Sequence, residues 1–244
     1  MTAQAPVETQ LLLSRIREDP SGTAIFLDVD GVLAPIVDVP ADACVPDDTR
    51  VELERLRDRY ALVACVSGRS GADAERVVGV QGLVYVGEHG LELVPEAPAW
   101  SDKLHEFAAT IDWDDVELKP ITVSFHYRRA DDEEAAVKLL AAVATRAEQE
   151  GFLPRFGRKI LEVRPPIHAD KGTAITYLLA ERALGRALFA GDDTTDLDGF
   201  RALENLDLGV RVAVSSAEAP TGLADCADIV VGSPRQLLDL LRTL

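Results

Sequence analysis

Short apolar runs alternate with amphipathic segments along most of the chain, and their lengths are typical of buried strands and surface helices. Residues 23–29, "TAIFLDV", predict a buried strand, and residues 47–60 predict a helix that buries Val51, Leu53 and Leu56. The same alternation predicts further strands at 61–68, 82–87, 187–192, 209–215 and 227–233, and further helices at 71–80, 172–185, 195–203 and 233–244. This order is typical of an α/β protein with a doubly wound, Rossmann-like parallel sheet covered by helices on both faces.

The pattern changes between residues 97 and 167. Residues 120–128, "PITVSFHYR", alternate with the two-residue period of a sheet that has one solvated face. A long helix is predicted over 131–151, with acidic residues in its first turn, and residues 152–165 predict a hairpin. A strand, a helix and two strands without parallel crossovers indicate a small α+β cap domain, inserted into a core made of 1–96 and 168–244.

The chain has 244 residues and a formal net charge of −17 at pH 7. A protein that binds nucleic acid would carry a basic stripe, which the sequence does not show, so we expect no nucleic-acid partner. An acidic chain also repels phosphate esters at long range, so a phosphate site must be built locally from a few cations or a metal ion. No sequence feature specifies an oligomeric state, and a monomer is consistent with the sequence.

We expect no membrane partner, because no segment approaches the ~20 apolar residues of a membrane span. The first residues lack the basic start of a signal peptide, and they predict an amphipathic helix with Val7, Leu11 and Ile16 on its apolar side. Three scattered cysteines without metal-ligand spacing indicate a reducing environment, and we therefore expect a cytoplasmic location.

Four strand ends and helix starts carry polar residues, and ligands of doubly wound sheets bind at the carboxyl ends of strands. The first is "DVDG", in which Asp28 ends a strand and Asp30 and Gly31 follow. Two such carboxylates can hold Mg²⁺, or can act as a nucleophile and a proton carrier. The alternative is that they only cap a turn. The apolar "VLAPI" that follows favours the functional interpretation.

Two further motifs have the chemistry of phosphate binding. In "VSGRS", the Ser67 hydroxyl can donate to a phosphate oxygen, Gly68 permits close approach of the backbone, and Arg69 can reach into the site or form a surface salt bridge. In "HADKG", Lys171 stands at a helix start, where a lysine opposes the helix dipole, and such a departure is expected at a functional site. Asp170 is interpreted as the cap of this helix.

The fourth motif, "GDDTTDLD", concentrates four carboxylates within seven residues. Asp192, Asp193, Asp196 and Asp198 would repel one another without a cation among them. Asp192 is therefore predicted to be a metal ligand, while Asp198 is expected to face solvent.

In the order "DVDG", "VSGR", "DKG", "GDDTTD", the chain resembles the haloacid-dehalogenase-like phosphatases over essentially its whole length. The stretches "DVDGVLAPIV", "GEHGLEL", "VSFHYR" and "GRKILEVRP" are similar to those of one family within that superfamily, the trehalose-6-phosphate phosphatases. The resemblance implies a haloacid-dehalogenase-like core and a Mg²⁺-dependent hydrolysis of trehalose 6-phosphate to trehalose and phosphate through an aspartyl-phosphate. A phosphatase for a different sugar phosphate and a non-catalytic sugar-phosphate-binding homologue are the alternatives.

The resemblance also implies roles for single residues. Asp28 would be the nucleophile, and Asp30 would protonate the leaving sugar oxygen and then activate water. Mg²⁺ would be held by the Asp28 side chain, the backbone carbonyl of Asp30, and Asp192, with Asp193 and Asp196 in support.

The same resemblance implies that residues of both domains bind the substrate. Ser67 and Lys171 would hold phosphoryl oxygens, and Glu88 and His89 would lie at the junction with the cap. In the cap, Arg158, Lys159 and Glu162 match a pattern that binds sugar hydroxyls, and the alternative for the first two is an exposed turn. His126 is interpreted as a hydrogen-bonded sheet residue, and Trp100 and Trp113 as packing residues.

The chain departs from the family pattern at two positions. Val32 stands where a threonine is more usual, and Glu88 stands where a serine is common. Neither change affects the predicted nucleophile or metal ligands.

Overall fold

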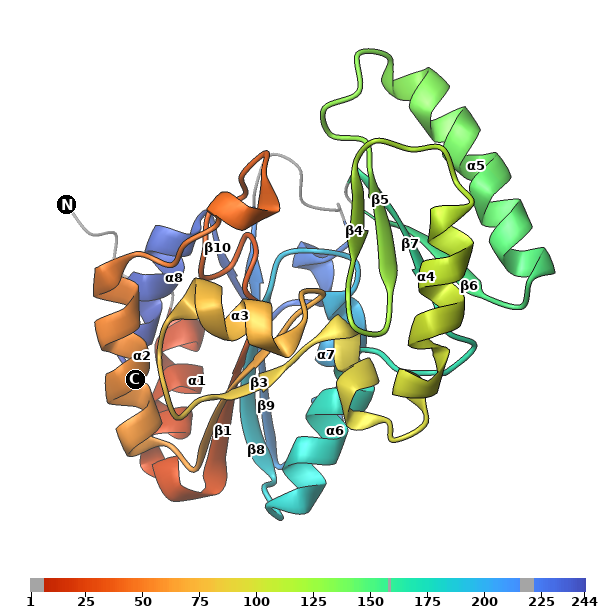
Figure 1. The fold of residues 1–244 in the computed structure, drawn as a ribbon. Coiled ribbons are helices and arrows are strands. Elements are labelled where there is room, and N and C mark those ends of the chain that lie inside the picture. The colour runs from red at the N-terminus through yellow and green to blue at the C-terminus, as the bar shows by residue number, and fades with distance from the viewer. Residues whose placement is uncertain (1–6, 158, 216–221) are drawn as a thin grey trace. The chain divides into compact units, whose positions relative to one another are not determined.

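The computed structural model describes residues 7–157, 159–215 and 222–244 (Figure 1). The chain forms two compact units. The first unit, called the core here, comprises the chain up to Gly90 and from Asp170 onward, and the second, Leu91–Ala169, is called the cap. Within the described residues, the core contains a six-stranded sheet and the cap a four-stranded sheet.

The core sheet is parallel throughout its described strands, with the order β10-β9-β8-β1-β2-β3. Later strands lie on both sides of β1, so the strand order reverses there, and ligands of open α/β sheets bind at such a point. The predicted α/β class with a parallel sheet is confirmed. The strands are β1 Thr23–Leu27, β2 Leu62–Val66, β3 Val84–Val86, β8 Arg186–Gly191, β9 Leu208–Val214 and β10 Ile229–Val231.

Helices cover both faces of the core sheet (Figure 1). Apolar side chains of α1, α2, α3 and α8 join Ile25 and Leu27 of β1 in one buried cluster. Side chains of a strand alternate between its faces, so the intervening positions point to the other face, where α6 and α7 lie. There Phe189 of β8 packs edge-on against Phe200 of α7, with ring centroids 5.7 Å apart. The helices are α1 Val7–Glu18, α2 Asp47–Arg59, α3 Gly71–Val78, α6 Lys171–Glu181, α7 Asp196–Ala202 and α8 Pro234–Leu241.

The predicted apolar side of the first helix is wrong at two of its three positions. Val7 and Leu11 are exposed, and Leu13 and Ile16 are the residues that α1 buries. At about 100° per residue, Ile16 lies on the opposite side of the helix from Val7, so the three predicted positions cannot share one face.

In α2, Leu53 and Leu56 are buried as predicted, but Val51 is exposed. The buried stripe of this helix runs through Thr49, Glu52, Leu53 and Leu56, which follow the three- and four-residue spacing of one helix face. Val51 lies two residues from Leu53, a rotation of about 200°, and therefore points away from the sheet.

The cap contains an antiparallel sheet with the order β4-β5-β7-β6. Its strands are β4 Val116–Leu118, β5 Val123–His126, β6 Leu153–Gly157 and β7 Ile160–Arg164, and its helices are α4 Ser101–Ala109 and α5 Glu133–Gln149. The long helix and the hairpin match the sequence prediction, and Asp132 caps α5 by accepting a hydrogen bond from the Ala135 N–H. The short helix α4 and the short strand β4 were not predicted from the sequence.

The two faces of the cap sheet differ in polarity. Val123, Phe125 and Leu161 pack with residues of α4 and α5 in one buried cluster. The alternate residues Ser124 and Glu162 lie on the other face, and both are buried. The expectation that this face is solvated is therefore wrong.

Short 3₁₀ helices lie in the connections, at η1 Pro20–Gly22, η2 Pro40–Asp42, η3 Glu88–Leu93, η4 Ala97–Trp100 and η5 Ala224–Cys226. Among the helices of the described chain, none has the length and apolarity that crossing a membrane requires.

Candidate active site

Asp28 follows β1 directly and lies at the point where the strand order reverses. Its side chain is buried, at 6% exposure of the residue. The backbone N–H of Val29 donates to Asp28 Oδ1 at 2.7 Å, and the N–H of Asp28 itself continues the sheet by donating to the Ala190 carbonyl at 3.0 Å. The carboxylate is thus held in one orientation by its own loop.

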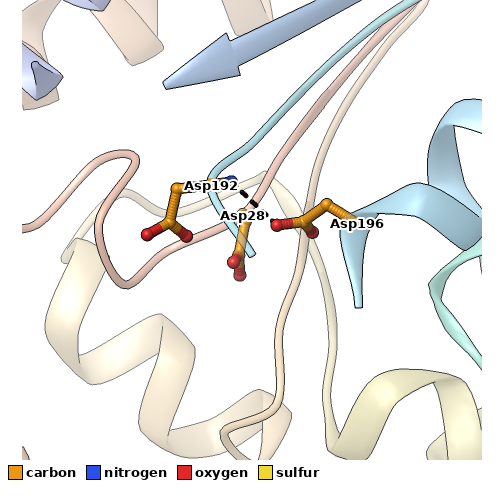
Figure 2. Close-up of side chains that lie close together, drawn as sticks. All are labelled: Asp28, Asp192 and Asp196. Carbon is orange, nitrogen blue, oxygen red and sulfur yellow. Dashed lines mark hydrogen bonds between the residues drawn. The ribbon is translucent and has the colours of Figure 1, made fainter. Parts of the chain in front are cut away.

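Two more carboxylates, Asp192 and Asp196, come from the loop after β8 and the start of α7, and Figure 2 shows them on either side of Asp28. Both are buried. The backbone N–H groups of Asp192 and Asp193 donate to Asp196 Oδ2 at 2.8 and 2.9 Å, which fixes the loop. One oxygen from each of Asp28, Asp192 and Asp196 can be chosen so that all three lie within 4.8 Å of one another, a spacing that could hold a metal ion.

Lys171 is buried beside these carboxylates. Its Nζ lies 2.8 Å from Asp28 Oδ2 and 2.6 Å from Asp196 Oδ1. Asp170 caps α6 as predicted, since its side chain accepts from the Thr173 N–H while the Thr173 hydroxyl oxygen accepts from the Asp170 N–H. The N-cap side chain of Asp170 and the carboxylates of Asp28 and Asp196 compensate for a cation at the start of the helix.

The charges of this group do not balance by themselves. Within this group of four side chains, three carboxylates face one ammonium group, an excess of two negative charges. Burial raises the pKa of Asp28 well above its ordinary range. The positive charge of Lys171 lowers this pKa, and the negative charges of Asp196 and Asp192 raise it further. Burial also lowers the pKa of Lys171, but the two neighbouring carboxylates outweigh it, and the pKa is raised. A divalent cation fits this environment by charge and by ligand type.

The "VSGRS" loop after β2 lies against the loop that carries Glu88 and His89. The Glu88 N–H donates to the Arg69 carbonyl at 2.7 Å, and the His89 N–H donates to the Ser67 carbonyl at 2.9 Å. A Cβ atom at Gly68 would lie 2.7 Å from His89 Nε2, so glycine at this position leaves room for the imidazole ring. Ser67 and Glu88 are both buried.

Arg69 makes an ion pair that is buried and not on the surface, while its predicted contact with phosphate stays a prediction. Its Nε and Nη2 donate to the two carboxylate oxygens of Asp30 at 2.7 and 2.8 Å. Its Nη1 donates to Asp73 Oδ2 at 2.5 Å. The side chain of Asp30 is therefore outside the three-carboxylate group. Asp73 was not predicted as a partner, although a position four residues after Arg69 is a typical spacing for an ion pair.

The remaining acids of the "GDDTTDLD" loop have local partners. Asp193 Oδ1 accepts from the Thr194 N–H at 2.7 Å, and its carboxylate is outside the group that could hold a metal. Asp198 pairs with Arg201 at 2.6 Å and is partly exposed.

Two of the candidate sugar-binding residues of the cap, Lys159 and Glu162, form ion pairs within the cap. Lys159, at φ 60°, pairs with Glu133 of α5. Glu162 is buried and lies 3.4 Å from Lys119 Nζ and 3.9 Å from Arg164 Nε. Lys119 was missed because no spacing links it to Glu162. Arg158 lies outside the described residues.

The polar and aromatic residues that were interpreted as structural have partners within the cap. His126 Nε2 lies 3.0 Å from Glu117 Oε2, and the His126 carbonyl accepts from Trp113 Nε1 at 2.9 Å. Trp100 packs edge-on against Phe152, with centroids 6.3 Å apart.

Gly31 brings the "DVDG" loop against Asp192. Its φ is 80°, and a Cβ atom there would lie 2.1 Å from Asp192 Oδ2. We expect Gly31→Ala to cost about 1 kcal/mol for left-handed backbone and a further loss for displacing Asp192. Denaturant unfolding and the metal-dependent shift in melting temperature measure the two effects.

Gly82→Ala is the matched control, because Gly82 has a φ of 82° in the same unit and its nearest neighbour is the flexible Arg57 side chain at 3.1 Å. It is expected to share only the backbone cost and to keep the metal-dependent shift. Equal metal-dependent shifts in both variants would contradict the close approach to Asp192.

The chain is similar to known proteins of one family. The family model described as trehalose-phosphatase matches residues 26–224. The chain is similar to probable trehalose-phosphate phosphatase D of Arabidopsis thaliana, with 30% identity over 86% of this chain and 65% of that protein, so the chain spans slightly less than two thirds of that relative.

Two solved structures share the fold. The C-terminal domain of trehalose-6-phosphate phosphatase from C. albicans has a TM-score of 0.75 at 24% identity, over 99% of this chain and 98% of that one. A haloacid dehalogenase-like hydrolase from Bacteroides thetaiotaomicron has a TM-score of 0.60 at 14% identity, over 90% of this chain and 98% of that one. The fold is therefore haloacid-dehalogenase-like. Because the family model covers most of its length, the chain belongs to the trehalose-phosphatase family.

Proposed function

We propose that this protein hydrolyses trehalose 6-phosphate to trehalose and phosphate, with Mg²⁺ as its cofactor and Asp28 as its nucleophile. One observation carries the proposal: the Asp28 carboxylate lies at the strand-order reversal, inside a group of three buried carboxylates and 2.8 Å from Lys171 Nζ. A carboxylate in such a group can attack phosphorus only if cations offset its repulsion from an anionic ester.

The phosphoryl group would be held by Lys171 and Ser67. Both side chains are buried, and both can donate hydrogen bonds to phosphoryl oxygens. The transition state of phosphoryl transfer spreads negative charge over these oxygens, so a fixed ammonium group stabilises it more than the ground state.

The reaction would proceed in two displacements. An Asp28 oxygen forms a bond to phosphorus, the bond from phosphorus to the sugar oxygen breaks, and Asp30, which would enter this step as the protonated carboxyl, gives its proton to that oxygen. A water molecule then attacks phosphorus, Asp30 takes a proton from the water, and the bond from Asp28 to phosphorus breaks to release inorganic phosphate. Asp28 and Asp30 return to their starting states.

Magnesium is the metal that best fits the donor set, because it is a hard cation that prefers carboxylate and carbonyl oxygens. Asp28, Asp192 and the backbone carbonyl of Asp30 would hold it, with Asp193 and Asp196 nearby in support. When bound, it supplies positive charge beside the transferring phosphoryl group. Asp196 already accepts from Lys171 and from two backbone N–H groups, which suits a residue that orients the loop.

Selection of the sugar would belong to the cap, in which Lys159 and Glu162 are candidate contacts to sugar hydroxyls, as is Arg158, which lies outside the described residues. In the core, Glu88 and His89 are candidate substrate-binding residues. The similarity to a plant trehalose-phosphate phosphatase supports trehalose 6-phosphate as the substrate. The cysteines Cys44, Cys65 and Cys226 are free, which supports a reducing compartment such as the cytoplasm.

A panel of sugar phosphates, with and without Mg²⁺, tests this function. We expect kcat/KM for trehalose 6-phosphate to exceed that for glucose 6-phosphate by about 100-fold or more, because the second glucose unit can contribute several hydrogen bonds. We also expect removal of Mg²⁺ by a chelator to stop phosphate release. Similar rates on monosaccharide phosphates would indicate a different sugar-phosphate phosphatase, and no Mg²⁺-dependent release from any substrate would indicate a binding protein.

A further inference from the structure

Arg69 is a buried cation between two carboxylates in the core. The residue is 8% exposed, and its guanidinium group binds both oxygens of Asp30 on one side and Asp73 on the other. Two parallel hydrogen bonds to one carboxylate fix its plane as well as its position. Within the described residues, no other side chain is hydrogen-bonded to the Asp30 carboxylate, which is itself about one-third exposed.

The rest of the structure holds Arg69 in place. Its N–H donates to Ser67 Oγ at 3.2 Å, and its carbonyl accepts from Glu88. Asp73, in the first turn of α3, is anchored a second time by Arg76 Nε at 2.8 Å. Burial raises the pKa of Asp73, but hydrogen bonds from Arg69 and Arg76 outweigh it and lower the pKa, so this anchor stays ionised at neutral pH.

These contacts leave Arg69 poorly suited to bind the phosphate group. An arginine has five N–H donors, and three of them are used on Asp30 and Asp73. One N–H remains on each Nη atom, but turning the whole guanidinium toward a phosphoryl group would break the pair with Asp30.

We infer that Arg69 is a positioning residue, which holds the Asp30 carboxyl group in the orientation that passes its proton to the leaving sugar oxygen. The inference rests on the role of Asp30 in the proposed function. It assigns Arg69 to the proton-transfer step and not to phosphate binding. Without the guanidinium, Asp30 could rotate about two side-chain bonds, and fewer of its orientations would reach the leaving oxygen.

The test compares two leaving groups. A sugar alkoxide needs a proton in order to leave, whereas 4-nitrophenolate leaves without one, so loss of proton transfer affects only the first. We expect Arg69→Met to lower kcat/KM for trehalose 6-phosphate by about 10- to 100-fold and to change kcat/KM for 4-nitrophenyl phosphate by less than about 3-fold. Arg76→Met is the matched control, because Arg76 also binds Asp73 but does not contact Asp30, and it is expected to keep both values.

A double-mutant cycle makes the assignment specific. In an Asp30→Asn background, Arg69→Met is expected to have no further effect on trehalose 6-phosphate, because the group that it positions no longer carries a proton. Equal losses on both substrates, with weaker inhibition by inorganic phosphate, would assign Arg69 to phosphate binding and overturn the inference. Equal losses with a lower melting temperature would assign it to the fold alone.

Failure of the proposed function is visible in the unmodified protein, before any Arg69 variant is measured. If the protein hydrolyses neither ester, both the function and the inference are wrong. If it hydrolyses both but Arg69→Met shows no dependence on the leaving group, only the inference is wrong.

Discussion

Asp28→Asn is expected to abolish phosphate release from trehalose 6-phosphate and to leave the fold intact. Asparagine has the shape of aspartate but neither the charge nor the second oxygen that attacks phosphorus, so we expect kcat to fall by about 1,000-fold or more. Initial rates of phosphate release at saturating Mg²⁺ measure the effect. Circular dichroism and the melting temperature show whether the fold is retained.

Asp198→Asn is the matched control for this substitution. Asp198 lies in the acid-rich loop and α7, is partly exposed and pairs with Arg201. Its change should leave kcat within about 2-fold, as is usual for a surface residue. If Asp28→Asn retained even a tenth of the normal kcat, another group would have to be the nucleophile.

The main parts of the site could be predicted because the sheet is parallel. Its strands end at the same edge, so polar residues at those ends meet although they are far apart in the sequence. Asp28 and Asp192 follow neighbouring strands, and they lie together with Lys171, which begins a later helix. An apolar run that ends in an acid is easy to recognise, because burying an unpaired charge at the end of a strand is unfavourable.

The partners within loops could not be predicted in the same way. A loop has no fixed period, so the sequence does not determine which of its neighbouring carboxylates turns inward. Asp192 and Asp196 point into the group, whereas Asp193 binds its own neighbour Thr194. The pair of Arg69 with Asp30 joins residues 39 positions apart and depends on how two loops pack.

The wrong predictions about the fold concern which side of an element is buried, although the periodicity of the element was correct. The prediction for α2 identified two buried leucines correctly but added Val51 because it is apolar, although the helix geometry places it on the outer side. In the cap, the alternation in β5 is real, and it separates Phe125 from Ser124. Polarity alone did not show that the polar face is buried, because that depends on partners such as Lys119, which pairs with Glu162.

Lys171→Met is expected to lower both activity and stability. Methionine keeps most of the apolar length of lysine but removes the ammonium group that lies 2.8 Å from Asp28 and 2.6 Å from Asp196. Two buried carboxylates then face each other without a cation, and breaking a buried ion pair in this way costs about 3–5 kcal/mol. In metal-free protein, this corresponds to a fall in melting temperature of about 6–20 °C. We also expect kcat to fall by about 100-fold or more, because a donor to the phosphoryl oxygens is lost.

The pH dependence separates the lost charge from lost packing. Lys171 opposes the burial that raises the pKa of Asp28, so its removal raises that pKa further. A carboxyl group with a raised pKa in the folded state costs stability as pH rises above its unfolded value near 4, and acidification removes that cost because the group becomes protonated. The stability deficit of Lys171→Met should therefore be large at pH 7 and should shrink toward pH 5. Arg201→Met removes an exposed cation from the same unit and is expected to cost less than about 0.5 kcal/mol at either pH. A deficit of the same size at both pH values would mean that Lys171 acts by packing, and the charge balance proposed for the site would then be wrong.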